Sequence, residues 1–294
     1  MLTGEYAVLD GAKALALPTK YGQKMTVKNS RGSDLVWICY DEQGEKWFSS
    51  HISLYDFSAV DTTDEAVSKV LQKILKNCVR LNSEFLSKWN GFKVETTLTF
   101  PRDWGLGSSS TLFNLVGQWA DVNPLELYFK VANGSGYDVA CGLAESPITY
   151  ISSADEVGYT AIDFEPTFSK DIYFVHLGQK ANSDDAIKEY IKKAKKKKQL
   201  VTDITSITDD VLTAKSLADF ETLLDKHESI ISAAMGYPTA KEQHFSDYWG
   251  SIKSLGAWGG DFVLATSSKS GADTSAYFMG KGFTTVVPYK DMIL

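Results

Sequence analysis

The sequence PRDWGLGSSST, residues 101–111, has the glycine and serine content of a loop that holds an anion with backbone N–H groups. Apolar and polar residues alternate over 92–100, which predicts a half-buried strand. Apolar residues recur at spacings of three and four over 112–119, which predicts a helix. The loop therefore leads from a strand into a helix N-terminus, where free N–H groups and the helix dipole favour an anion.

Two better-known glycine motifs do not fit these letters. A Walker A loop ends in Gly-Lys-Ser/Thr, but no lysine follows Gly107. A dinucleotide fingerprint needs a third glycine where Ser110 stands, and an acidic residue about twenty positions further on. We therefore expect a phosphate-binding loop of another kind. A serine-rich turn that only caps a helix is the alternative.

Three further segments have suggestive compositions: GEYAVLDG at 4–11, GSGYDVA at 134–140 and LGAWGGDF at 255–262. Together with the loop, and in this order, they resemble the GHMP small-molecule kinase superfamily, whose members phosphorylate galactose, homoserine, mevalonate and phosphomevalonate. The resemblance extends from the first residues to about residue 266. It is strongest to the mevalonate and phosphomevalonate kinase branch, and within that branch to phosphomevalonate kinases.

The resemblance implies an α+β, two-domain GHMP kinase fold. The expected parts are an N-terminal ribosomal protein S5 domain 2-like domain, which binds ATP, at 1–165, and a C-terminal ferredoxin-like α+β domain at 166–294. A chain of 294 residues is long enough for two domains.

The resemblance also implies the cofactors, ATP and Mg²⁺, and the residues that hold them. The residues expected to bind ATP are Pro101, Gly105, Leu106, Gly107, Ser108, Ser109, Ser110 and Thr111. Asp138 matches the catalytic aspartate of the family, which takes a proton from a substrate hydroxyl or orients an acceptor phosphate; a helix-capping aspartate is the alternative. Ser109, with Ser108 and Ser110 close behind, and Glu126 are the expected magnesium ligands, although Glu126 equally fits a first-turn helix acid.

Substrate contacts are expected in four places. They are Glu5 and Tyr6 in the first segment, Ser135 and Gly136 in the turn before Asp138, Lys180, Asn182 and Ser183 at the start of a predicted helix, and Gly259, Gly260 and Asp261 in the last glycine segment. Lys188 to Lys198 contain seven lysines, which we interpret as a solvated helix end.

The chain departs from the family at two positions. Relatives carry Gly-Lys just upstream of the first motif, on a strand whose lysine neutralises the transferred phosphate, whereas no lysine occurs here before Lys13. This leaves open an earlier start, a substitute lysine, or weak activity. The bulky Trp258 stands where relatives have smaller residues, so the identity of the substrate is open.

Composition favours a soluble enzyme. The formal net charge of −7 disfavours nucleic acid as a partner. No apolar run of eighteen residues and no signal peptide are evident, so we expect a cytoplasmic protein with no membrane partner, and a homodimer is one option for its assembly. Cys39, Cys78 and Cys141 and the four histidines lack the spacing of a metal site or a disulfide framework.

The sequence thus predicts an ATP-dependent kinase of a small isoprenoid-pathway metabolite, phosphomevalonate before mevalonate. The alternative is a non-catalytic relative that binds a nucleotide or a phosphorylated metabolite without turnover. The aspartate motif of diphosphomevalonate decarboxylases, which share the fold, is not recognisable.

Overall fold

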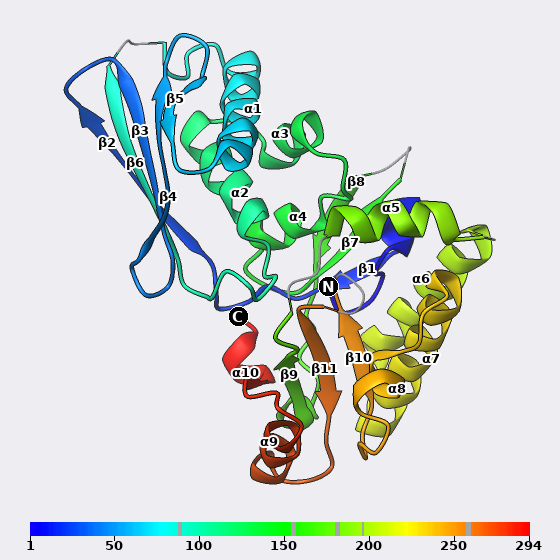
Figure 1. Ribbon diagram of the computed structural model, residues 1–294. Helices are drawn as coiled ribbons and strands as arrows, with labels where there is room; N and C mark the ends of the chain where they lie inside the picture. Colours follow the sequence, from blue (N-terminus) through cyan, green and yellow to red (C-terminus); the bar gives the residue numbers. More distant parts are fainter. Residues whose placement is uncertain (88–89, 154–156, 180–182, 196, 257–259) are drawn as a thin grey trace. The chain divides into compact units, whose positions relative to one another are not determined.

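The computed structural model describes residues 1–294 except 88–89, 154–156, 180–182, 196 and 257–259 (Figure 1). The chain divides into two compact units. Unit 1 comprises Met1–Lys20, Asp103–Gly105 and Ala144–Leu294, and unit 2 comprises Tyr21–Arg102 and Leu106–Leu143. Both 1–20 and 144–165, the two ends of the predicted first domain, fall in unit 1. The predicted division at residue 165 stays a prediction.

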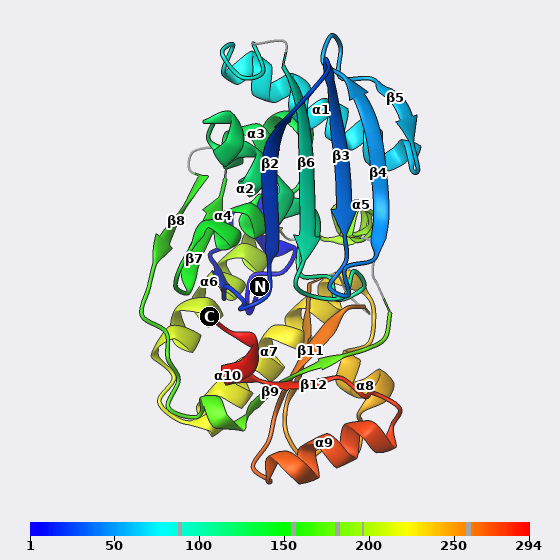
Figure 2. The same cartoon turned by 90° about the vertical axis from the view of Figure 1, so that its left-hand side faces the viewer.

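Unit 2 is built on one five-stranded sheet with the order β2-β6-β3-β4-β5. Its strands are β2 (Gln23–Ser30), β3 (Asp34–Tyr40), β4 (Lys46–Ser53), β5 (Ala59–Thr62) and β6 (Gly91–Leu98). Its helices are α1 (Glu65–Leu81), α2 (Ser108–Ala120), α3 (Pro124–Val131) and α4 (Tyr137–Leu143). All strand pairs are antiparallel except β3 with β6, which is parallel. Helices α1 and α2 lie on one side of this sheet (Figures 1 and 2).

Period-two alternation explains how the sheet of unit 2 buries one face. In β6, Val94, Thr96 and Leu98 are buried, and Glu95 and Thr97 between them are partly exposed. In β3, Leu35, Trp37 and Cys39 point to the same core as the buried side of α1. Since alternate strand residues face opposite sides of a sheet, this pattern fixes the register.

Helix α1 begins at a side-chain cap. The side chain of Asp64 is the N-cap and accepts from the N–H groups of Ala66 and Val67. The Thr62 hydroxyl instead lies 2.6 Å from the Ser68 hydroxyl, because Thr62 is still the last residue of β5.

Unit 1 contains two sheets, with the orders β1-β7-β8 and β10-β11-β9-β12. The strands are β1 (Ala14–Ala16), β7 (Ile148–Ser152), β8 (Val157–Ala161), β9 (Ile172–His176), β10 (Ile252–Leu255), β11 (Phe262–Thr266) and β12 (Val286–Pro288). The helices are η1 (Ala7–Asp10), η2 (Ser169–Asp171), α5 (Ser183–Lys193), α6 (Lys197–Thr213), α7 (Leu217–Met235), α8 (Ala240–His244), α9 (Gly271–Gly280) and α10 (Tyr289–Met292).

The four-stranded sheet of unit 1 is antiparallel throughout, and β9 and β11 are buried along their whole length. Near-continuous apolar runs such as Phe262-Val263-Leu264-Ala265 fit such central strands. Helix α7 packs against β10. Within the part of the chain that the structure describes, no helix is long and apolar enough to cross a membrane.

The lysine run does not form one continuous helix. Helix α5 ends at Lys193 with Lys192 and Lys193 in its last turn, and α6 starts at Lys197. Lys188 forms an exposed ion pair with Asp185, which agrees with a solvated face. Lys197 differs, since its ammonium group donates to Asp10.

Candidate active site

Helix α2 starts without a side-chain cap. Its N-cap is Gly107, in the left-handed conformation with φ 74°, and Gly105 also has a positive φ of 64°. The first helical hydrogen bond runs from Thr111 N–H to the Gly107 carbonyl at 2.9 Å, so the N–H groups of residues 108–110 precede the helical ladder. Such an end of a helix favours a bound anion through its free donors and its dipole.

The hydroxyl groups of the loop differ in their hydrogen bonding and exposure. The Thr111 hydroxyl lies 3.0 Å from both the Gln23 side-chain oxygen and the Ser108 carbonyl, and Ser110 is buried. Ser109 is exposed, and its hydroxyl has no hydrogen-bond partner within the described residues. Ser109 is therefore the loop hydroxyl most available to a ligand.

Asp138 lies close to this helix end, within unit 2. It is in the first turn of α4, and a Cβ built on Gly107 would be 3.8 Å from the Cβ of Asp138. Helix α4 is tied to α2 because the Asn114 amide donates to the Val139 carbonyl at 3.0 Å. The side chain of Asp138 is exposed, yet desolvation by the surrounding protein raises its pKa, while a hydrogen bond from Tyr137 lowers it. The carboxylate is thus beside a predicted phosphate site and more basic than an ordinary aspartate.

The turn before Asp138 is compact. Ser135 and Gly136 are both buried, and Gly136 has a φ of 80°, which a glycine adopts without strain. The Gly136 carbonyl accepts from Ala140 N–H at 3.1 Å, so this turn sets the start of α4. Pro101 and Leu106, also predicted to bind ATP, are half-buried.

Glu126 has the surroundings of a first-turn helix acid. It lies in the first turn of α3, where the Asn123 side chain caps the N–H groups of Leu125 and Glu126. Its carboxylate is 3.6 Å from the Lys130 ammonium, and its side chain is 57% exposed. No group of three or more His, Cys, Asp or Glu that could hold a metal occurs among the described residues. A role for Glu126 as a magnesium ligand stays a prediction.

In unit 1, the last glycine segment contacts the loop's first glycine. A Cβ on Gly105 would collide with the Asp261 carboxylate, so only glycine allows this approach. Asp261 is 8% exposed and has a φ of 47°, which is rare for a residue with a side chain. Two backbone bonds of 2.8 Å hold it, from Leu177 N–H to its carbonyl and from its own N–H to the Gln179 carbonyl.

Aromatic residues fix the preceding loop residues in unit 1. The Trp104 ring packs edge-on against Phe262, with 5.4 Å between the centroids. The His176 Nε2 atom lies 3.1 Å from the Asp103 carbonyl. Residues 103–105 are thus seated at the end of strands β9 and β11.

Polar groups of the first motif, Gly4-Glu5-Tyr6, are buried and bonded to other parts of unit 1. Glu5 is 5% exposed, and its Oε1 accepts a hydrogen bond of 2.7 Å from the ammonium group of Lys253, which is 1% exposed. Gly4 N–H donates to the His227 Nε2 at 3.1 Å. The motif is therefore held from β10 and α7 by buried polar groups.

The remaining groups of this cluster carry little net charge. Burial lowers the pKa of His227 well below its ordinary value, helped by the nearby Lys253 charge, so His227 is neutral. Burial raises the pKa of Glu228 to about 7, although the Ser254 N–H and hydroxyl donate to its carboxylate. We call Glu5, His227, Glu228 and Lys253 the buried polar cluster.

Tyr6 stands beside this cluster in an unusual conformation. Its φ is 59°, and its ring stacks on Tyr190 with 5.5 Å between the centroids. The Tyr190 hydroxyl donates to Asp10 at 2.5 Å, and Lys197 donates to the other oxygen of Asp10 at 2.9 Å. Tyr6 is 7% exposed.

Several predicted contacts cannot be placed. Lys180, Asn182 and Gly259, as well as Trp258, lie outside the described residues. Ser183 begins α5, and Gly260 is buried beside Asp261.

Comparisons with known proteins identify the fold. No family model matches the chain, and no curated protein matches its sequence. Among solved structures, the mevalonate kinase of Methanococcus jannaschii has a TM-score of 0.69 at 16% identity, covering 97% of this chain and 93% of that one. The phosphomevalonate kinase of Streptococcus pneumoniae, in complex with phosphomevalonate and AMPPNP, has a TM-score of 0.68 at 14% identity, covering 97% and 96%. The galactokinase of Lactococcus lactis, complexed with galactose, has a TM-score of 0.69 at 14% identity, covering 96% and 86%.

The chain therefore has the two-domain GHMP kinase fold, as the sequence motifs predicted. Its structural neighbours are small-molecule kinases that include mevalonate kinases, phosphomevalonate kinases and galactokinase. At these identities the likeness establishes the fold, and the substrate has to be argued from the site.

Sequence reasoning missed the buried polar cluster of unit 1. Only Glu5 was singled out, as a substrate contact. Strand β10 has the sequence Ile252-Lys253-Ser254-Leu255, and the structure buries both of its polar residues. A lysine in a buried strand needs a carboxylate partner, but the sequence does not say which one.

Proposed function

We propose that this protein is an ATP-dependent small-molecule kinase whose acceptor is a small isoprenoid-pathway metabolite, phosphomevalonate before mevalonate. The observation that carries the proposal is the uncapped N-terminus of α2, with Gly107 at the N-cap and Asp138 beside it. The neighbour bound to phosphomevalonate and AMPPNP supports the choice of acceptor and of nucleotide.

The loop would bind the β- and γ-phosphates of ATP. The N–H groups of residues 108–110 supply donors without side-chain competition, and the α2 dipole adds a positive potential. Phosphoryl transfer spreads negative charge over the moving group, so donors that are fixed before the reaction lower its barrier.

Asp138 would act on the acceptor. An acceptor oxygen attacks the γ-phosphorus while the bond from phosphorus to the β–γ bridging oxygen breaks, and ADP leaves. With a hydroxyl acceptor, the Asp138 carboxylate takes the proton that this oxygen loses; with an acceptor phosphate, it orients that group. The raised pKa of Asp138 suits it as a proton acceptor.

Magnesium would take oxygen donors, which a serine hydroxyl and a carboxylate supply. The exposed Ser109 hydroxyl, with no hydrogen-bond partner among the described residues, and one carboxylate, for which Glu126 is our choice, would hold it. When bound, the ion would neutralise charge on the phosphates.

The test is a coupled ADP-release assay with Mg-ATP and a panel of phosphomevalonate, mevalonate, homoserine and galactose. We expect acceptor-dependent ADP release that is highest with phosphomevalonate. Asp138→Asn protein, purified in parallel, controls for contaminating kinases. Release that is the same with and without every acceptor would overturn the proposal.

A non-catalytic relative that binds nucleotide without turnover is the second candidate. It is favoured by the burial of Glu5, because a carboxylate paired with Lys253 is not free to bind an acceptor. Saturable Mg-ATP binding together with no ADP release for any acceptor would support this second candidate.

A further inference from the structure

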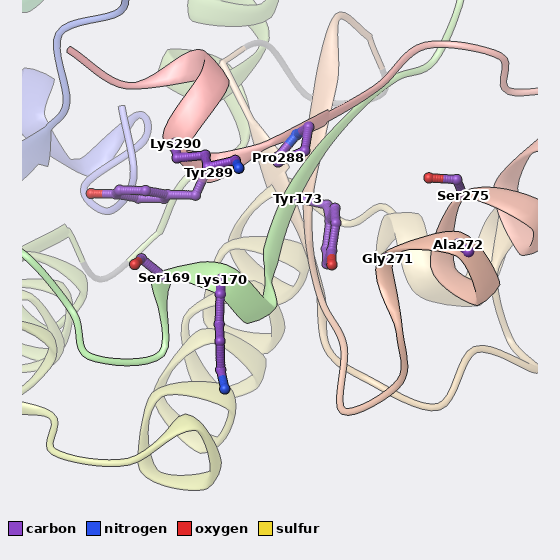
Figure 3. Close-up of a pocket in the computed structure, with 9 residues that line it drawn as sticks. All are labelled: Ser169, Lys170, Tyr173, Gly271, Ala272, Ser275, Pro288, Tyr289 and Lys290. Atoms are coloured by element: carbon purple, nitrogen blue, oxygen red, sulfur yellow. The ribbon is translucent and has the colours of Figure 1, made fainter.

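A pocket of about 460 Å³ lies in unit 1, beside the first turn of α9 (Figure 3). It is lined by η2, the start of β9, the start of α9, and the segment from β12 into α10. Tyr173 is at the first half of β9 and pairs with Ala265, whereas His176 ends the strand opposite Phe262. The pocket is therefore at the other end of β9 from Asp261, and it is separate from the residues used in the proposed function.

Helix α9 offers two unused donors to this pocket. The Ser270 hydroxyl caps Asp273 N–H at 3.2 Å, and the Ser270 carbonyl accepts from Thr274 N–H at 3.0 Å. The N–H groups of Gly271 and Ala272 have no hydrogen-bond partner within the described residues. At the first turn of a ten-residue helix, these donors point where an anion is favoured.

The Tyr173 hydroxyl is a third, independent donor. Tyr173 is only 6% exposed, and its hydroxyl forms no hydrogen bond with any described residue. A Cβ built on Gly271 would lie 3.2 Å from this hydroxyl, and Figure 3 shows the ring directed toward Gly271. The ring is buried while the hydroxyl reaches the pocket, so this donor is held in place and open to a ligand there.

The charges around the pocket are compatible with an anion. Lys170 and Lys290 are exposed lining residues, and neither ammonium forms an ion pair in the part of the chain that the structure describes. Burial raises the pKa of Tyr173, and the nearby Asp171 charge raises it further, so the phenol stays neutral and able to donate. Asp171 also limits how much negative charge the pocket accepts.

We infer that this pocket binds a phosphate group, held by the N–H groups of Gly271 and Ala272 and by the Tyr173 hydroxyl. The group is either free phosphate or the phosphate of a small ester. The volume of the pocket exceeds that of one phosphate, and Pro288 and Tyr289 supply an apolar wall for the remainder of an ester.

The test is a titration of the full chain with inorganic phosphate and, separately, with glycerol 3-phosphate, followed by amide resonances in TROSY spectra. We expect saturable shifts of the Gly271 and Ala272 amides. Tyr173→Phe should weaken binding about tenfold, because it removes one hydrogen bond to a charged group while keeping the ring. Tyr159→Phe, at an exposed tyrosine of β8, is the matched control and should leave the affinity unchanged.

The two probes distinguish the sources of the phosphate group. Tighter binding of glycerol 3-phosphate identifies an ester, and equal or weaker binding identifies free phosphate. Shifts confined to other residues, such as the loop at 107–111, would overturn the inference. So would an affinity in Tyr173→Phe protein, checked as folded by its spectrum, that equals that of the wild type.

Discussion

The N-terminus of α2 and the Gly4-Glu5-Tyr6 motif differ in how their polar groups are bonded. Both combine glycine with polar residues and a following helical turn. At α2 the first N–H groups are uncapped and Ser109 is exposed. In the first motif, Gly4 N–H is bound by His227, and the Glu5 carboxylate is bound by Lys253 in a buried setting. The unused groups at α2 are exposed backbone donors, whereas in the first motif Gly4 N–H and Glu5 Oε1 are bonded within the protein, and Glu5 Oε2 is buried without a hydrogen-bond partner among the described residues.

The largest effect should come from removing the Lys253–Glu5 ion pair of the first motif. Lys253→Met leaves the Glu5 carboxylate buried without its partner, so we expect a loss of about 3–5 kcal/mol in the free energy of unfolding. Urea unfolding followed by circular dichroism measures it. Lys13→Met is the matched control, because Lys13 pairs with Asp209 at the surface and should cost about 1 kcal/mol or less.

A double variant sharpens this test. Lys253→Met combined with Glu5→Gln removes both charges, so it should be more stable than Lys253→Met alone. If Lys253→Met and Lys13→Met lose the same small amount, the first motif is not closed by this ion pair.

The next largest effect concerns Asp138, beside the open helix end. Asp138→Asn should lower kcat at least about a hundredfold, the scale of a general base, and leave the Kd of Mg-ATP nearly unchanged. The coupled assay and calorimetric titration measure the two quantities. Unchanged kcat with a lower unfolding midpoint would assign Asp138 to the capping of α4 instead.

Gly107→Val tests the N-terminus of helix α2 as the nucleotide site. A valine there places its side chain in the space that phosphates need, so Mg-ATP should no longer raise the melting temperature by mass action. The substitution also strains a backbone with φ 74°, and Gly236→Val, at the C-cap of α7 with φ 69° and open space around it, controls for that strain. A full nucleotide-dependent shift in Gly107→Val protein would place the nucleotide elsewhere.

The smallest effect is the pH dependence of the buried polar cluster. The folded-state pKa of Glu228, about 7, is above its ordinary value of 4.5, so its contribution to stability is fully present below pH 4.5 and is lost as the pH rises through 7. The wild type should lose on the order of 1 kcal/mol between pH 5.5 and 8.

Glu228→Gln removes this titration. Its stability should vary less with pH over the same interval, as measured by urea midpoints at each pH. His227, whose pKa is lowered, acts in the opposite direction and destabilises the fold as the pH falls below about 6.5. An equal slope in Glu228→Gln protein and the wild type would remove Glu228 from this account.

The local elements were largely predictable, because each depends on a period or a stop signal within one segment. Alternation over 92–100 predicted β6 (Gly91–Leu98) to within two residues, and the GHMP motifs predicted the two-domain fold. The helix after the loop was also predicted, but its buried side includes Phe113 and Asn114, which the spacing of Leu112, Leu115 and Trp119 did not reveal.

The buried polar cluster could not be predicted, since Glu5 lies more than 200 residues from its other three members in the sequence. Lys253 and Glu5 meet only because β10 and the first motif come together in the tertiary structure of unit 1. The same is true of Asp261 and Gly105, whose contact depends on two positive φ angles that the letters Gly-Gly-Asp do not specify. The sequence does not tell which motifs keep exposed, unbonded polar groups and which have them buried and bonded within the protein.

The most direct test of this account is a titration of the full chain with Mg-AMPPNP, followed by amide resonances of Ser108–Thr111 and of Gly4–Tyr6. We predict large, saturable shifts for Ser108–Thr111 and much smaller ones for Gly4–Tyr6, because only the first segment has free donors. No shift at Ser108–Thr111 under conditions that saturate binding would contradict the assignment of the α2 N-terminus as the nucleotide site.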